Sequence, residues 1–307
     1  MSEMPLPRAM GASLRATFWD EARGYQRLAY VVGAALVLTG LAHGAIWAVV
    51  GGPIEGPLSW RKPATFGLSF GLTTLTLGWI GGHLRVPAWS GWLVSVLLCV
   101  STALEVVWVS VQRARGVPSH FNDMTALDGA LFTAGGVTIA VTDIALLLIT
   151  VAAFTACTAP APMAWAIRGG MLALLAAQVV GMWMIVHGIG LLDAGASPLT
   201  HSMSTYGRAG AMKYAHAVPM HAIQVLPGLA WLMGFSRLSE RARLVAMSAA
   251  IAGYASLFAV ALGRTALGLE PFDLLSLSTL LYLVPALLLG AASVATAAGL
   301  RRRSGLG

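Results

Sequence analysis

Residues 28–50 read LAYVVGAALVLTGLAHGAIWAVV, an apolar run without a charged side chain. A transmembrane helix needs about 20 predominantly apolar residues, so this run is long enough to cross a bilayer. Similar runs recur along the chain and predict eight spans, at 28–50, 63–83, 88–111, 125–157, 163–190, 212–235, 242–267 and 274–299. The sequence therefore predicts an all-α, polytopic membrane bundle.

The composition agrees with a membrane protein, because 57% of the 307 residues are hydrophobic and only 10% are charged. A soluble domain carries about 25% charged residues. Residues 1–27 are too polar for a cleavable signal peptide, and their apolar positions follow a helical spacing over 13–27. We expect an amphipathic interfacial segment at 1–27, one transmembrane domain at 28–300 and a basic cytoplasmic tail at 301–307.

The basic residues indicate the orientation of the chain in the membrane. With the N-terminus inside, the inner segments hold 12 Lys and Arg side chains and the outer segments hold 7. Cytoplasmic segments carry the excess of basic residues, so we expect both termini in the cytoplasm and the inner (plasma) membrane as the location. The net charge of +7 then faces anionic lipid, and the bilayer explains it without a nucleic-acid partner.

Ionisable residues gather at one depth under this topology. Glu105 interrupts an apolar run far along the span 88–111, and Asp128 lies in the first turn of the span 125–157. Five of the seven histidines fall in the outer half of the membrane, namely His43, His120, His187, His216 and His221. Because ionisable groups at this depth usually face a cavity or one another, we expect Glu105 to point into the bundle.

The stretch QRARGVPSHFNDMTALD, residues 112–128, is the densest polar run. Thr125 and Asp128 have the spacing of a capping box at the start of a helix. That interpretation accounts for Thr125 and Asp128, but it does not account for His120 or for Arg115 beside the membrane.

The stretch KYAHAVPMHAIQVLP, residues 213–227, places Lys213, His216, His221 and Gln224 on one arc of a helix. Two histidines about 140° apart do not easily bind one ion on a regular helix. Pro219 lies between them and is expected to disturb the helix, which would bring the two rings closer together.

These patterns favour a metal or haem site in the outer half of the membrane. The five histidines are the candidate ligands for haem b or for iron, copper or zinc, and Glu105 and Asp128 are the candidate catalytic carboxylates. Arg115, Arg208, Lys213 and Gln224 are candidates for binding the cofactor. Basic groups suit haem propionates, and Gln224 together with Lys213 suits an anionic group of the ligand. Such a protein would be an oxidoreductase acting on a lipid-soluble or other small substrate.

Three alternatives stay open. Ser119–His120, Asp128 and the late histidine pair resemble the alkaline ceramidase and adiponectin-receptor superfamily, and the resemblance implies a zinc-dependent intramembrane hydrolase. That superfamily has seven helices and an HxxxH pair, whereas this chain has eight expected spans and HxxxxH. A proton-coupled transporter would use the same ionisable residues as a relay. A structural subunit of a membrane complex would need no cofactor.

Overall fold

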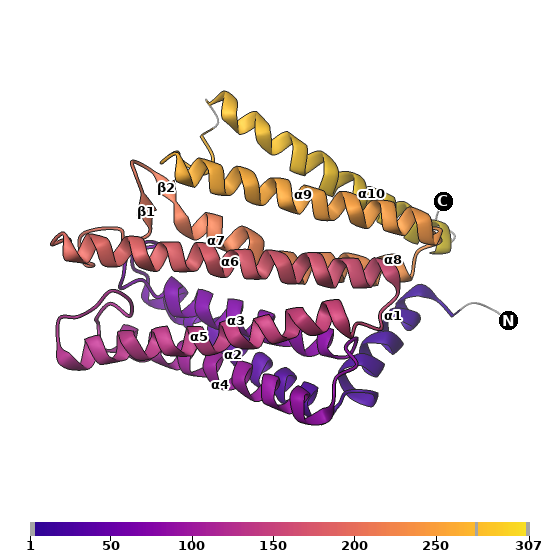
Figure 1. Cartoon of the computed structure of the whole chain (residues 1–307), viewed down its shortest axis with the longest axis horizontal. Coiled ribbons are helices and arrows are strands. Elements are labelled where there is room, and N and C mark those ends of the chain that lie inside the picture. The colour runs from indigo at the N-terminus through magenta and orange to yellow at the C-terminus, as the bar shows by residue number, and fades with distance from the viewer. Residues whose placement is uncertain (1–3, 274–275, 305–307) are drawn as a thin grey trace.

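The computed structural model describes residues 4–273 and 276–304 and forms an all-α bundle (Figure 1). In chain order the elements are α1 (Leu6–Arg15), a π-helical turn (Ala16–Asp20), α2 (Gly24–Val50), α3 (Arg61–Gly81), α4 (Ala88–Ala114), α5 (Ala126–Thr155), α6 (Ala161–Asp193), β1 (Thr205–Tyr206), β2 (Gly210–Ala211), α7 (Met212–Met220), α8 (Ala222–Gly234), α9 (Glu240–Ala266), a 3-10 turn (Leu277–Tyr282) and α10 (Leu283–Ser304). The two strands pair antiparallel as a small hairpin.

Within the described residues, seven helical segments are long and apolar enough to cross a membrane, which indicates a multi-pass membrane protein. The segments are α2, α4, α5, α6, α7 with α8, α9, and the 3-10 turn with α10. The expected span at 63–83 corresponds to α3, which has 21 residues but does not reach the hydropathy of the other seven. Its buried face holds glycines and threonines, because α3 packs inside the bundle against α2.

Glycines set the close approach of α2 to α3. A Cβ atom added to Gly40 would lie 2.6 Å from the backbone nitrogen of Leu68, and one added to Gly67 would lie 2.6 Å from the Cα of Gly40. No side chain fits at such distances, so the glycines allow backbone contact between the two helices. This contact fixes the position of α3, on which part of the candidate site depends.

The helix expected at 212–235 is interrupted at His221, where α7 ends and α8 begins. Pro219 has no N–H to donate and its ring crowds the preceding turn. The expected disturbance of this helix by Pro219 is confirmed, and His221 lies at the interruption in an exposed position.

The N-terminal helix lies earlier in the chain than expected. It runs from Leu6 through the π-helical turn to Asp20, whereas residues 24–27 belong to α2. Pro5 and Pro7 explain the early start, because proline suits the first turn of a helix. Trp231 of α8 donates a hydrogen bond to Ser13 at 3.1 Å and ties this segment to the bundle. Figure 1 shows α1 and the end of α10 at the same end of the molecule.

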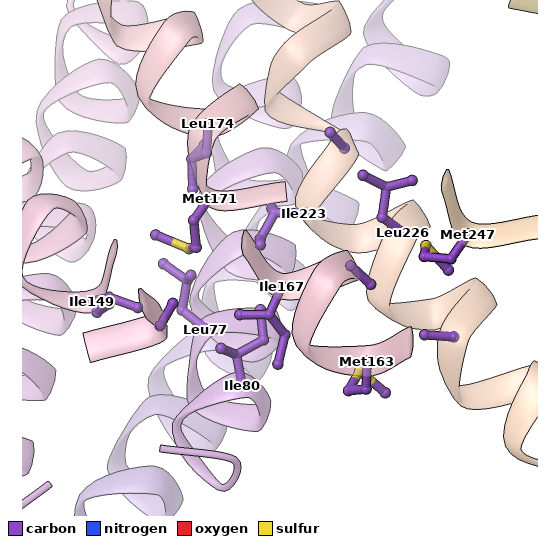
Figure 2. Packing of buried hydrophobic residues seen from close by; sticks show 14 of the residues in the cluster. Leu77, Ile80, Ile149, Met163, Ile167, Met171, Leu174, Ile223, Leu226 and Met247 are labelled. Carbon is purple, nitrogen blue, oxygen red and sulfur yellow. The ribbon is translucent and has the colours of Figure 1, made fainter. Parts of the chain in front are cut away.

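The core lies between α3, α5, α6, α8 and α9 (Figure 2). Its largest fully buried side chains include Ile80, Ile167, Met171, Ile223 and Met247. A continuous apolar core of this kind holds the helices together as one bundle. Two ionisable side chains, Lys62 at the start of α3 and Glu105 in the second half of α4, are not part of this core.

Candidate functional site

Glu105 lies inside α4 with an exposed fraction of 0%. This burial confirms the expectation that its carboxylate does not face lipid. Thr138 of α5 donates a hydrogen bond to Oε1, whereas Oε2 has no hydrogen-bond partner in the described part of the chain. A buried carboxylate oxygen without a partner is costly, so Oε2 is a point at which a proton or a ligand group would be stabilised.

Lys62, in the first turn of α3, supplies an opposite charge. Its ammonium group interacts electrostatically with Glu105, His120 and Lys213. Across residues 4–273 and 276–304, no carboxylate oxygen lies within 4.0 Å of the Lys62 ammonium. Lys62 and Glu105 therefore attract each other without forming a direct ion pair.

His120 lies between α3 and α4 and connects their side chains. The centroid of its ring lies 4.7 Å from that of Trp108 and 5.5 Å from that of Phe66. Nδ1 of His120 and Oγ of Ser119 are 3.1 Å apart. The buried Nε1 of Trp108 has no hydrogen-bond acceptor among the described residues, so a second unsatisfied polar atom lies one helical turn from Glu105.

The loop that carries His120 has an unusual backbone. Phe121 has a φ of 55°, a left-handed conformation that is rare for a bulky residue. Asn122 holds the loop in place, because it donates to the carbonyl of Pro118 at 2.9 Å and accepts from the backbone of Met124 at 3.2 Å. The ring of Phe121 packs against Gly188 of α6. Strain of this kind is often found where a loop must position a functional side chain.

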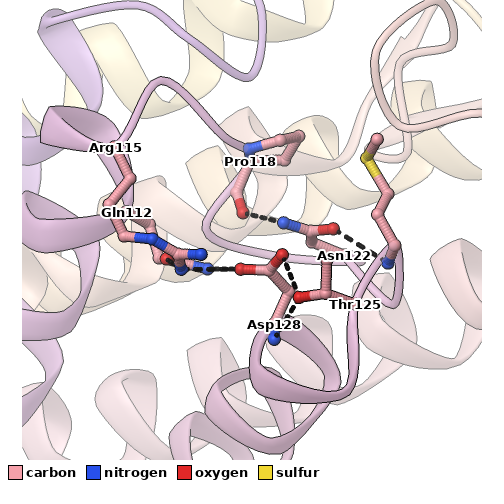
Figure 3. A network of polar contacts seen from close by, with 7 residues as sticks. Gln112, Arg115, Pro118, Asn122, Thr125 and Asp128 are labelled. Atoms are coloured by element: carbon pink, nitrogen blue, oxygen red, sulfur yellow. Dashed lines mark hydrogen bonds and ion pairs between the residues drawn. The ribbon is translucent and has the colours of Figure 1, made fainter.

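A second polar network fixes the base of this loop (Figure 3). Asp128 accepts hydrogen bonds on Oδ1 from Gln112 at 3.0 Å and from Arg115 at 2.7 Å. Thr125 donates to the other oxygen, and its hydroxyl accepts from the backbone of Asp128 at 3.1 Å. The expected cap by Thr125 is confirmed. Both carboxylate oxygens of Asp128 accept hydrogen bonds, so Asp128 joins the end of α4 to the start of α5 and holds the loop between them.

A row of hydroxyl groups continues from Glu105 toward the other end of α4. Oγ of Ser101 and Oγ1 of Thr142 are 2.7 Å apart, and Thr142 donates to the carbonyl of Thr138 at 3.0 Å. Ser101 and Thr102 both donate to the carbonyl of Leu98, at 3.2 Å and 2.7 Å. Leu98 also lines a pocket near the start of α2, together with residues that include Gln26 and Ser95.

The other candidate histidines have separate surroundings. Nδ1 of His43 lies 2.8 Å from the carbonyl of Thr39 on the same helix, and its ring stacks on Trp60. Nε2 of His187 lies 3.0 Å from the carbonyl of Thr205 in the hairpin. Nδ1 of His216 lies 2.7 Å from the carbonyl of Ala177 on α6. In the part of the chain that the structure covers, no three His, Cys, Asp or Glu side chains lie close enough together to hold a metal ion.

The candidates for cofactor binding are likewise spread out. Arg115 binds Asp128, and Lys213 lies 3.7 Å from Glu55 in the loop after α2. Arg208 is exposed next to the hairpin. Gln224 hydrogen-bonds Thr73 of α3 at 3.1 Å, so it joins α8 to α3.

Lys62, Trp108 and Thr138 are the site residues that the sequence analysis missed. From the sequence, Lys62 is one of several basic residues that would suit a haem propionate, and nothing in the pattern places it beside Glu105. The sequence does indicate that Trp108 lies near Glu105, because the two residues are three positions apart and therefore share one face of the helix.

Burial lowers the pKa of His120 well below its usual value of about 6.5, and the charges of Lys62 and Lys213 lower it further. The folded protein thus keeps His120 neutral at a pH at which the unfolded chain is protonated. The contribution of neutral His120 to the free energy of unfolding is fully present above about pH 6.5, the pKa of histidine in the unfolded chain. This contribution is lost as the pH falls below that value. We expect the Tm advantage of the wild type over His120→Gln to shrink between about pH 7 and about pH 5, measured in detergent. An advantage that grows on acidification would contradict this assignment.

No protein-family model, no curated protein and no solved structure matches this chain.

Proposed function

We propose that this chain is a proton-coupled transporter of the inner (plasma) membrane. The observation that carries the proposal is Glu105, a fully buried carboxylate with one unpartnered oxygen, within electrostatic reach of Lys62. A carboxylate in such a place takes up or releases a proton when a charge near it changes. This is the property that couples the movement of a solute to the movement of a proton.

The proposal includes eight crossings with both termini in the cytoplasm. Counting α3 as a crossing gives an even number, in agreement with α1 and the end of α10 lying at one end of the bundle. The excess of basic residues assigns that end to the cytoplasm. The site of Glu105, Lys62 and His120 then lies in the outer half of the membrane.

Transport also needs polar groups on the inner side of Glu105. The hydroxyl row through Ser101 and Thr142 supplies them, and it leads toward the pocket near Gln26 at the inner ends of the helices. Asp143, next to Thr142, has a buried Oδ1 without a partner among the described residues. These groups support a path for a proton across the bundle.

The test uses purified protein in liposomes that contain a pH-sensitive dye. Gradients of small anions, cations and neutral solutes are imposed in turn, and the initial change of internal pH is recorded. We expect one class of solute to move protons with the wild type, and Glu105→Gln to reduce the rate to that of empty liposomes. Glu240→Gln is the matched control, because Glu240 is exposed at the start of α9.

Unchanged proton movement in Glu105→Gln would refute the role of this carboxylate. The absence of proton movement with every class of solute would refute the transporter.

A haem or metal oxidoreductase is the second candidate, and His216 favours it. The contact of Nδ1 with the carbonyl of Ala177 leaves Nε2 free to act as a ligand, which is how ligating histidines are commonly oriented. A haem needs one or two histidines, whereas the residues described do not gather a donor set for a zinc hydrolase. Absorption spectra with iron, copper and zinc analysis, repeated on His216→Ala, separate this candidate from the transporter.

A further inference from the structure

The substrate class can be inferred from three polar groups around Glu105, two of which are buried without a hydrogen-bond partner among the described residues. The proposal below rests on the proposed function and adds to it the chemistry of the solute. The two unpartnered atoms are Oε2 of Glu105 and Nε1 of Trp108, and the third group is the ammonium of Lys62, which attracts Glu105. The carboxylate oxygen accepts hydrogen bonds, whereas the ammonium group and the indole N–H donate them.

These groups belong to one neighbourhood. Glu105 and Trp108 are three residues apart and lie on the same face of α4. Lys62 and Phe66 are four residues apart on α3, and the ring of His120 contacts both Phe66 and Trp108. Lys62 brings an opposite charge to this neighbourhood from α3, because its ammonium group and Glu105 attract each other.

We infer that this site binds a small monocarboxylic acid with an apolar body, and that one proton is held between its carboxyl group and Oε2 of Glu105. The carboxyl oxygens of the solute accept from Lys62 and from Nε1 of Trp108. The shared proton satisfies Oε2, and the rings of Phe66, Trp108 and His120 contact the apolar body.

Charge balance explains why the proton must accompany the solute. Glu105 and the solute each carry one negative charge, and Lys62 and the proton each carry one positive charge, so the occupied site is neutral. Without the proton, two carboxylates would face one ammonium inside the bundle, which low polarity strongly disfavours.

This balance counts only the groups that would contact the solute, and other charged and polar groups lie around them. His120 contributes from the loop as a neutral ring and Thr138 contributes from α5 as a hydroxyl that already binds Oε1. Lys213 of α7 lies 3.7 Å from Glu55, a carboxylate that Arg61 also binds at 2.9 Å. The charge of Arg115, at the end of α4, is neutralised by its ion pair with Asp128 in the first turn of α5.

The experiment measures binding of acetate, butyrate and benzoate to the purified full-length protein by calorimetry at several pH values. We expect at least one of them to bind, with an affinity that rises as the pH falls, by up to about 10-fold per pH unit for one proton. Trp108→Phe keeps an aromatic ring but removes the N–H, and it is expected to weaken binding by about 10-fold. Trp89→Phe, at a position with 70% exposure, is the matched control and should bind like the wild type.

Lys62→Met provides a second variant that is independent of the tryptophan, and it is expected to weaken binding by at least about 10-fold. Tm values and gel filtration check that each variant is folded. Binding of none of the three acids to the wild type, or binding that is unchanged in Trp108→Phe and Lys62→Met, would overturn the inference.

The liposome assay separates this failure from that of the proposed function. If methylammonium or phosphate drives proton movement that depends on Glu105 while the three acids do not, the substrate class is wrong and the transporter stands. If no solute moves protons, both are wrong.

Discussion

Replacing Gly67 with leucine is expected to separate α3 from α2 and to prevent the bundle from assembling in its native form. A Cβ atom at Gly67 would already lie 2.6 Å from both the nitrogen and the Cα of Gly40, and 2.9 Å from the carbonyl oxygen of Leu36. These are backbone atoms, so no side-chain rotation relieves the overlap. Overpacking of a core costs about 1–3 kcal/mol even where side chains can move, and we expect a larger loss here.

The measurement is the yield of monodisperse protein after extraction, together with its Tm. Gly67→Ala should already lower the Tm, because the overlap involves the Cβ atom itself. Gly44→Leu on α2 is the control, since a Cβ atom there has no neighbour within 4 Å. Equal Tm values for Gly67→Leu and Gly44→Leu would show that α2 and α3 do not pack as described.

This contact also bears on the site, because α3 carries Lys62 and Phe66. A partial separation of α2 and α3 would move Lys62 away from Glu105 without any change in α4. We therefore expect Gly67→Ala, if it is stable enough to purify, to weaken binding of a carboxylate probe, whereas Gly44→Leu should not.

The local features of the chain could be predicted from its sequence. Periodicity and hydropathy located the long helices, the spacing of Thr125 and Asp128 indicated the cap, and Pro219 indicated the interruption before His221. Each of these depends on residues within a few turns of one another. The burial of Glu105 was also predictable, because an isolated carboxylate in an apolar helix is too costly to face lipid.

The composition of the site was harder to predict, because depth in the membrane does not determine which helices are neighbours. His43, His187 and His216 are at similar expected depth, yet each binds a different backbone carbonyl. The opposite charge that acts on Glu105 comes instead from α3, whose Lys62 is 43 positions earlier in the chain. The contact between these two helices depends on packing across the whole bundle, which no local pattern encodes.

Replacing Asp128 with alanine is expected to release the loop that carries His120. The buried Gln112 would lose an acceptor, Arg115 would lose its ion pair and Thr125 would lose one partner of its hydroxyl. A buried amide left without a partner is destabilising, and the loss of the cap weakens the first turn of α5. We expect Asp128→Ala to lower the Tm by several degrees and Asp128→Asn to lower it less, because asparagine keeps an acceptor oxygen.

Asp20→Ala is the control for this variant, since Asp20 forms an ion pair with Arg15 at 3.3 Å in which both side chains are largely exposed. Exposed pairs contribute about 0–1 kcal/mol, so its Tm should be close to that of the wild type. Binding of benzoate distinguishes positioning from catalysis. If Asp128 only holds the loop, Asp128→Asn should bind benzoate with nearly wild-type affinity, because the backbone of Phe121 and the ring of His120 stay in place. A complete loss of proton movement in Asp128→Asn, with Tm and benzoate affinity unchanged, would instead make Asp128 a member of the proton path.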